Sequence, residues 1–229
     1  MVRRLTLDWP AAGPFAARGG RPIRWLAVSD DRDPALDHAT NRADIGAIDA
    51  IVGAGDLEPD YLGFLADAFA APLAFVRGNH DHGGRWEDSV AALAPTPLRT
   101  GRVHDVTGLP VVALEWPGLR HRDRRRHDAS AWVDCLELAV RRAPATVARA
   151  SAATVVLSHA PPRGLGDRAA DPYHAGYAGY RWLLERWRPS VWLHGHVPPA
   201  SVDGWRVTHD GSDVVNVTGA VLIEIRPPA

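Results

Sequence analysis

The chain of 229 residues contains one cysteine, Cys135, and no lysine, so all 26 of its basic residues are arginines. A single cysteine excludes an intramolecular disulfide bond and a zinc site built from several cysteines. The absence of lysine excludes a Schiff-base lysine and the phosphate-binding lysine of a P-loop. No run approaches the ~20 consecutive apolar residues that a membrane-spanning helix needs. We therefore expect a cytoplasmic globular protein that does not cross a membrane.

The formal net charge of −1 gives no general attraction to nucleic acid or to an anionic membrane. The most basic stretch, residues 120–127, is expected to be a solvated loop, with binding of a phosphorylated substrate or a nucleic-acid backbone as the alternative. Trp86, Trp116 and Trp205 are expected to be packing residues, with stacking on a ligand as the alternative. Nucleic acid is therefore not the favoured partner.

Short apolar runs alternate with helical patterns, which predicts parallel strands joined by right-handed crossovers. Strands are expected at residues 23–28, 50–53, 73–76, 111–114, 154–157 and 191–193. Helices are expected at residues 58–71, 129–142 and 175–187, the second with Trp132, Leu136 and Ala139 facing inwards. Turn residues separate the apolar runs of residues 205–225, which predicts an antiparallel meander. We expect residues 1–22 to form an arm or an edge hairpin before one domain at residues 23–229.

Five of these strands are followed by side chains that can bind a metal ion: Asp30, Asp56, Asn79, His159 and His196. In open α/β sheets the functional crevice lies at the carboxyl ends of the strands, so we expect these residues to converge. Taken singly, the aspartates are better explained as helix caps and the histidines as core residues, but in this ordered set metal binding is favoured. Oxygen and imidazole donors suit Mn, Fe, Zn or Mg ions. Such an ion lowers the pKa of bound water and stabilises charge on a phosphoryl oxygen.

The residues after Asn79 add acid–base chemistry to this set. The ring of His80 is expected to face the same cavity and to donate a proton to a leaving oxygen. Asp81 is expected to hold the other ring nitrogen of His80. His80 and Asp81 are therefore the candidate catalytic residues.

The ordered motifs resemble those of the calcineurin-like metallophosphoesterase superfamily: Ser29-Asp30, Gly55-Asp56, Gly78-Asn79-His80-Asp81, Ser158-His159 and Gly195-His196. Residues 158–167, followed by His174, are similar to the small uncapped bacterial members. The resemblance implies a four-layer α/β/β/α sandwich of two mixed sheets. It also implies two metal ions bridged by Asp56, and hydrolysis of phosphomonoesters or phosphodiesters by a metal-bound hydroxide.

Two motifs depart from the family pattern, and both departures affect the same metal. The family's Asp-x-His reads Asp30-Asp31-Arg32 here, and its Gly-His-x-His reads Gly195-His196-Val197-Pro198. The first of the two metal sites therefore retains only Asp30 and a share of Asp56. The second site keeps its whole set: Asp56, Asn79, His159 and His196.

We therefore expect one tightly bound divalent ion, with the second ion weak or absent. Mn, Fe and Zn are favoured, and Mg is a further option. Arg32 cannot bind a cation, so it is expected to contact a substrate phosphoryl oxygen, together with Asn79, or to pair with Asp30. As an alternative, Asp31, Asp33 or His209 rebuilds a weaker first site.

The expected function is metal-dependent hydrolysis of a phosphodiester or of a phosphorylated small molecule. A nuclease is the alternative if residues 120–127 bind a nucleic-acid backbone. A protein that binds a metal and a phosphorylated ligand without hydrolysing it is the alternative from a different class, because two family ligands are missing.

Overall fold

The computed structural model of the protein describes residues 2–82, 96–119, 127–141 and 153–228. Its strands are β1 (Arg3–Asp8), β2 (Ile23–Ser29), β3 (Ala50–Gly53), β4 (Leu73–Phe75), β5 (Arg102–Val106), β6 (Leu109–Leu114), β7 (Val155–Ser158), β8 (Val191–His194), β9 (Arg206–His209), β10 (Ser212–Asn216) and β11 (Gly219–Arg226). Its α-helices are α1 (Gly13–Ala16), α2 (Ala39–Ile45), α3 (Pro59–Phe69), α5 (His127–Arg141) and α7 (Ala178–Trp187). Short 3₁₀ helices are η1 (Pro34–Asp37), η3 (Pro117–Leu119) and η5 (Pro199–Ser201).

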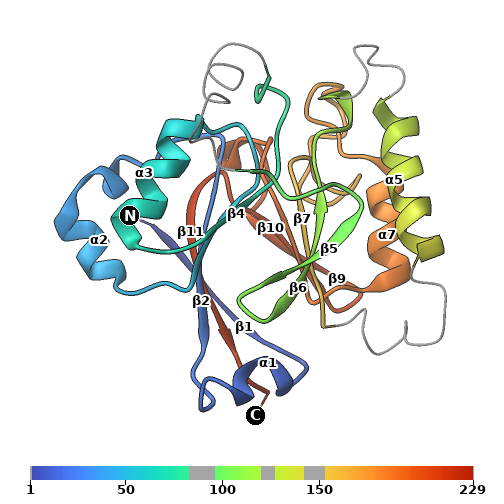
Figure 1. The fold of residues 1–229 in the computed structure, drawn as a ribbon. Helices are drawn as coiled ribbons and strands as arrows, with labels where there is room; N and C mark the ends of the chain where they lie inside the picture. Colours follow the sequence, from blue (N-terminus) through green and yellow to red (C-terminus); the bar gives the residue numbers. More distant parts are fainter. Residues whose placement is uncertain (1, 83–95, 120–126, 142–152, 229) are drawn as a thin grey trace.

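The strands form two mixed sheets that lie face to face between two layers of helices (Figure 1). The first sheet has the order β1-β11-β2-β3-β4, and the second has the order β5-β6-β7-β8-β10-β9. Parallel pairs join β2, β3 and β4 in the first sheet and β6, β7, β8 and β10 in the second. Helices α2 and α3 cover the first sheet, and α5 and α7 cover the second. The predicted four-layer α/β/β/α sandwich is confirmed.

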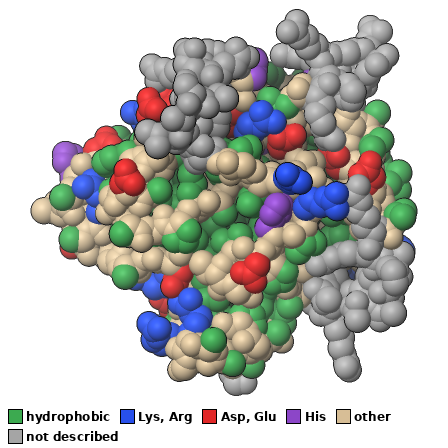
Figure 2. Space-filling model, in the orientation of Figure 1, with side chains coloured by type: hydrophobic (Ala, Val, Ile, Leu, Met, Phe, Trp, Pro, Cys, Tyr) green, Lys and Arg blue, Asp and Glu red, His purple; other side chains and the backbone are tan. Residues whose placement is uncertain are grey.

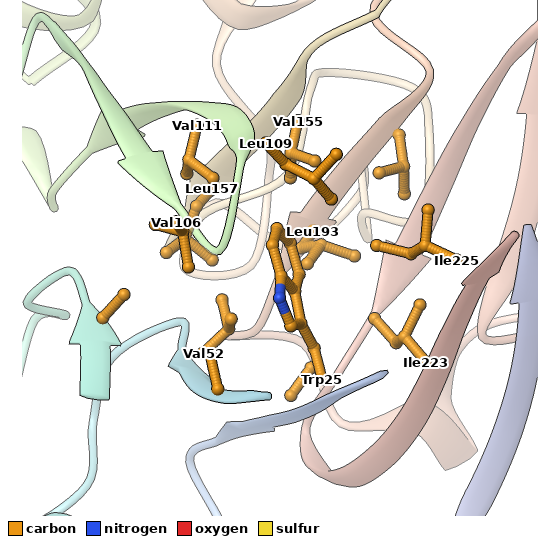
Figure 3. Close-up of a cluster of buried hydrophobic side chains, with 14 of the residues drawn as sticks. Trp25, Val52, Val106, Leu109, Val111, Val155, Leu157, Leu193, Ile223 and Ile225 are labelled. Atoms are coloured by element: carbon orange, nitrogen blue, oxygen red, sulfur yellow. The ribbon is translucent and has the colours of Figure 1, made fainter. Parts of the chain in front are cut away.

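The main hydrophobic core lies between the two sheets, where inward side chains of both sheets meet (Figure 3). Trp25 of β2 is fully buried there, and its Nε1 donates to Thr107 Oγ1 at 2.9 Å. Val52 and Ile223 approach from the first sheet, and Leu157 and Leu193 approach from the second. Burying this apolar surface fixes how the two sheets face each other, and therefore where their strand ends meet.

Both chain termini depart from the predicted arrangement. Strands β9 and β10 form an antiparallel pair, but β11 crosses to the first sheet and pairs with β2, so the prediction of a meander is wrong. Residues 1–22 contribute an edge strand, β1, that pairs in parallel with β11 rather than within a hairpin. An apolar pattern shows that a strand is buried, but it does not indicate which of two sheets the strand joins.

The inward face of α5 differs from the predicted one. Ala131, Cys135 and Leu138 are buried against the second sheet and α7, whereas Leu136 is 49% exposed. This helix carries apolar residues on both faces, including the exposed Val140, so its periodicity alone was ambiguous. In α7, by contrast, the apolar residues Tyr180, Leu184 and Trp187 share one face at helical spacing, and all three are buried.

Acidic and basic side chains both occur on the surface of the described part of the chain. On the face shown in Figure 2, acidic and basic side chains are interspersed rather than gathered into one large field. Among the helices of the described ranges, none combines the length and the apolar character that crossing a bilayer requires.

Because only one face of α5 is buried, truncating two of its leucines should lower the free energy of unfolding by different amounts. Leu138→Ala removes a side chain that is 2% exposed and should lower the free energy of unfolding by about 2–5 kcal/mol. Leu136→Ala, two residues earlier and half exposed, should cost less than about 1 kcal/mol. Urea denaturation of both variants measures the difference, and equal costs would show that this helix is rotated from the position described.

Candidate metal centre

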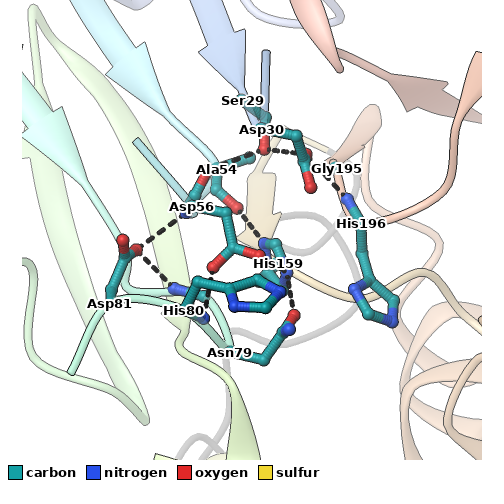
Figure 4. A network of polar contacts seen from close by, with 12 residues as sticks. Ser29, Asp30, Ala54, Asp56, Asn79, His80, Asp81, His159, Gly195 and His196 are labelled. Carbon is teal, nitrogen blue, oxygen red and sulfur yellow. Dashed lines mark hydrogen bonds and ion pairs between the residues drawn. The ribbon is translucent and has the colours of Figure 1, made fainter. Parts of the chain in front are cut away.

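The candidate site lies where the loops after β2, β3 and β4 of the first sheet meet the loops after β7 and β8 of the second (Figure 4). Three of its residues have left-handed backbone conformations: Asp30 with φ 58°, Asp56 with φ 56° and His196 with φ 66°. Residues with side chains seldom adopt this conformation, and it clusters at functional sites. It turns the chain sharply just beyond a strand and places these side chains over the strand ends.

Four of the predicted metal ligands come together at this point. Asp56, His159 and His196 each offer a ligand atom, and these atoms all lie within 4.8 Å of one another. Asn79 Oδ1 lies 2.8 Å from His159 Nε2, and Asp56 Oδ2 lies 3.2 Å from the same nitrogen. In the described part of the chain this is the one such group of histidine, cysteine and acidic side chains.

Backbone carbonyls fix the orientation of both imidazole rings. His159 Nδ1 donates to Ala54 O at 2.8 Å, and His196 Nε2 donates to Tyr173 O at 2.8 Å. A carbonyl oxygen only accepts, so each contact leaves the other ring nitrogen to face the cluster. Hydrogen bonds of this kind orient histidines that bind metals. The arrangement therefore fits a divalent cation held by two imidazoles, one carboxylate and one amide oxygen.

The buried charges of the cluster also favour a cation. Burial alone would lower the pKa of His159, but the Asp56 and Asp30 carboxylates raise it to about 9. Burial would raise the pKa of Asp56, but its hydrogen bond and charge interaction with His159 hold it below the usual range. Burial and the positive charge of His159 lower the pKa of His196 to about 3. The protein thus holds a proton on His159 between two oxygen acceptors, where a metal ion would replace it.

Two glycines allow the loops to approach this closely. A Cβ atom at Gly78 would overlap Asp56 Oδ1, and a Cβ atom at Gly195 would overlap Ser29 Oγ and Asp30 Oδ2. Any larger residue at either position would push the strand-end loops apart. These glycines explain why the motifs pair Gly with Asn79 and with His196.

Asp30 lies beside the cluster but is not one of the three residues of the close group. Its Oδ2 accepts hydrogen bonds from Ser29 Oγ at 2.6 Å, from the backbone N–H of His196 at 2.9 Å and from Thr218 Oγ1 at 3.1 Å. Burial raises the pKa of Asp30 above its usual value. Asp30 therefore ties the end of β2 to the loops after β8 and β10.

Asp81 does not hold the His80 ring, so that prediction is wrong. Asp81 Oδ2 accepts from the backbone N–H groups of Asp56 at 2.8 Å and Gly78 at 2.7 Å, and it shapes both loops (Figure 4). The short side chain reaches these amide groups because it lies between the two loops. The His80 backbone N–H donates to Asp56 Oδ1 at 2.7 Å, which places the exposed His80 ring beside the cluster.

Arg32 does not pair with Asp30, which was one of the two contacts predicted for it. Its guanidinium pairs with Glu58 and lies over the Tyr61 ring, 4.8 Å from the ring centre. A nearby carboxylate and an aromatic face thus hold the arginine away from the cluster.

The alternative ligands for a first metal site are also placed elsewhere. Asp33 caps η1, with Oδ1 accepting from the Ala35 N–H at 2.9 Å. His209 Nε2 contacts Arg181 at 3.0 Å on the far strand β9. Asp31 is exposed and is not part of the close group. Among the described residues, none of the three rebuilds the first site.

Two aromatic residues contact the cluster, and sequence reasoning had not connected either to it. Tyr173 touches Asn79, His80 and His196, and the Trp116 ring lies 4.8 Å from that of His196 and 5.7 Å from that of His159. Trp116 is a packing residue as expected, but it packs against the site itself. Tyr173 follows the motif of residues 158–167 after a loop, and nothing in one sequence marks it.

A cavity of about 160 Å³ opens beside this cluster. Its walls include Trp116, Tyr173 and Tyr177, and its rim includes the charged residues Asp128 and Arg163. Residues 120–126 of the basic run and Trp86 lie outside the described residues. His127, the one described residue of the basic run, also lines this cavity and packs against Trp116, with ring centres 5.8 Å apart.

Residues 33–200 match a family model described as calcineurin-like phosphoesterase. A search of curated proteins finds no match.

Similar solved structures were also found. They include a conserved uncharacterized protein, a predicted phosphoesterase, from Streptococcus pneumoniae (13% identity, TM-score 0.37, 87% of this chain and 74% of that chain). They also include Vacuolar Protein Sorting 29 from Cryptosporidium parvum (11% identity, TM-score 0.37, 87% of this chain and 75% of that chain).

The raised pKa of His159 predicts that cation binding depends on pH. Because the imidazole must lose its proton to bind a metal, affinity should rise with pH by up to about tenfold per unit below the pKa of about 9. Isothermal titration calorimetry of the metal-free protein with Mn²⁺ at pH 6.5, 7.5 and 8.5 measures the slope. An affinity that stays constant across this range would show that His159 does not give up a proton to the ion.

Proposed function

The chain belongs to the calcineurin-like phosphoesterase family, and on that premise we propose that it is a metal-dependent phosphoester hydrolase that works with one tightly bound ion. The observation that carries the proposal is the convergence of Asp56, Asn79, His159 and His196 from both sheets. Mn, Fe and Zn ions suit this mixture of imidazole and oxygen donors, and Mg is a weaker match.

The proposal of one ion depends on what surrounds Asp30. Its Oδ2 accepts three hydrogen bonds from the protein, so this oxygen already has a structural role and is not free to bind a second cation. Arg32 and Pro198 occupy the positions of the two missing family histidines. The described residues thus support a complete second site and an incomplete first one.

Different residues of the site have different roles in the proposed hydrolysis. A bound divalent cation supplies Lewis acidity to a phosphoryl oxygen and acidifies a coordinated water. Asp56, Asn79, His159 and His196 would hold the cation, and backbone carbonyl contacts orient the two imidazoles. His80, anchored through its backbone to Asp56, presents its ring on the exposed side and donates a proton to the leaving oxygen.

The open side of the site favours small substrates. Tyr173 is 39% exposed at the edge of the cluster, and the neighbouring cavity measures about 160 Å³. A phosphodiester or a phosphorylated small molecule can reach such a site from solvent. Arg32 remains a candidate contact for the phosphoryl group only if it leaves Glu58.

A second candidate function follows from the same departures. Two histidines of the family's first metal site are replaced by Arg32 and Pro198, and Oδ2 of its remaining aspartate, Asp30, is engaged by the protein. A protein with this site could bind a metal and a phosphorylated ligand without hydrolysing it. Turnover separates the two functions, because only the enzyme converts substrate.

Replacement of His80 tests the enzyme directly. With Mn²⁺, Fe²⁺, Zn²⁺ or Mg²⁺ loaded in turn, an aryl phosphodiester and an aryl phosphomonoester should reveal turnover by the native protein with at least one ion. In His80→Ala, kcat should fall by about 10²–10⁴-fold because the proton donor is lost. Mn²⁺ binding, measured by calorimetry, should persist because the four ligands remain.

The matched control is His104→Ala, a partly exposed histidine on β5 whose Nε2 contacts Arg99 O at 3.0 Å. It should leave turnover unchanged. Absence of turnover with every ion, combined with retained Mn²⁺ binding, would contradict the hydrolase and support the binding protein. Turnover that survives in His80→Ala would contradict the role of this histidine.

A further inference from the structure

We propose that Tyr173 is a positioning residue that orients two of the metal ligands, Asn79 and His196, and couples them to His80. The inference rests on the proposed metal centre and extends it to a residue outside the family motifs. The inference rests on contacts made by two groups of Tyr173, its phenol hydroxyl and its backbone carbonyl.

The hydroxyl of Tyr173 determines which way the Asn79 amide faces. Asn79 Nδ2 donates to Tyr173 Oη at 2.9 Å, while Asn79 Oδ1 faces His159 Nε2 at 2.8 Å. The side-chain amide of Asn79 has a donor, Nδ2, on one side and an acceptor, Oδ1, on the other. Because Tyr173 Oη accepts from Nδ2, Oδ1 stays on the side of the cluster. Only that oxygen can bind a cation. Without the phenol oxygen, a rotation of the amide would turn its NH₂ group toward the ion.

The same hydroxyl reaches His80. Tyr173 Oη lies 3.2 Å from His80 Nε2, so the phenol bridges a metal ligand and the proposed proton donor. Because the hydroxyl accepts from Asn79, its own hydrogen can point toward His80. The contact restrains a ring that otherwise faces solvent.

The backbone carbonyl of Tyr173 orients the third partner. It accepts from His196 Nε2 at 2.8 Å, which places the proton on that nitrogen and leaves Nδ1 as the nitrogen that can bind a cation. The Tyr173 and His196 rings also pack together, with their centres 5.3 Å apart. A side-chain substitution removes the hydroxyl but keeps this carbonyl, so the two effects can be separated.

The segment around Tyr173 is held firmly enough to position other residues. The Tyr173 N–H donates to Asp171 Oδ1 at 3.0 Å, and Asp171 Oδ2 contacts His174 Nδ1 at 2.6 Å. Asp167 accepts from the N–H groups of Gly164 at 3.0 Å and Gly176 at 2.8 Å, which closes the loop. The loop therefore presents Tyr173 at a fixed place although the residue is 39% exposed.

Removing only the hydroxyl tests the proposal. Tyr173→Phe should weaken Mn²⁺ binding by the metal-free protein by about tenfold, because losing an orienting partner typically costs 10–100-fold in affinity. Its melting temperature without metal should match that of the native protein. Loaded with saturating Mn²⁺, the variant should also show a lower kcat with little change in KM, through the lost contact with His80.

The matched control is Tyr177→Phe, which deletes the phenol hydroxyl of a buried tyrosine in the same loop. Tyr177 is 7% exposed and packs against Trp116 without touching Asn79 or His80. Mn²⁺ affinity should be unchanged in this variant. Equal affinities of Tyr173→Phe and the native protein, or equal losses in both tyrosine variants, would overturn the positioning role.

A double-mutant cycle identifies the partner. In Asn79→Asp the two carboxylate oxygens are equivalent and need no orientation, so adding Tyr173→Phe should change Mn²⁺ affinity by less than about threefold. A full tenfold loss in that background would overturn the orientation of Asn79 by the hydroxyl. Absence of Mn²⁺ binding by the native protein would overturn the metal centre itself, and the role of Tyr173 with it.

Discussion

The contact between His159 and the pair Asp56 and Asn79 depends on both sheets at once. Asp56 and Asn79 follow β3 and β4 of the first sheet, whereas His159 follows β7 of the second. The hydrophobic core around Trp25 packs the two sheets against each other, and this packing places His159 Nε2 3.2 Å from Asp56 Oδ2. A fully buried imidazole facing two oxygens costs stability unless a positive charge sits between them. A proton supplies that charge in the metal-free protein, and a divalent cation would supply more.

Under the proposed function, the family's second metal site is complete and its first is not. Asp30 serves as an acceptor for Ser29, His196 and Thr218. It holds the His196 backbone in the left-handed turn that aims the ring at the cluster. Asp30 thus supports the remaining site through the backbone of a ligand, so a structural role explains it without a second ion.

Local patterns predicted the elements and the convergence, but not the contacts that depend on tertiary packing. The strands that precede Asp30, Asp56 and His159 were identifiable from their short apolar runs, and the resemblance of the ordered motifs to the family implied the sandwich. The partner of β11 and the inward face of α5 were mispredicted, because hydropathy does not distinguish two sheets or two apolar helix faces. Arg32 was misplaced because its partner Glu58 lies 26 residues away along the chain. Tyr173 was missed because its role arises only when its loop folds back over Asn79.

On the proposed function, one divalent ion binds where the two sheets meet. Anomalous diffraction at the manganese edge, from crystals of the protein soaked in Mn²⁺, locates every bound ion. We expect one strong peak surrounded by Asp56, Asn79, His159 and His196, with no comparable peak beside Asp30. Two peaks of equal height, or a peak away from these four residues, would contradict the account.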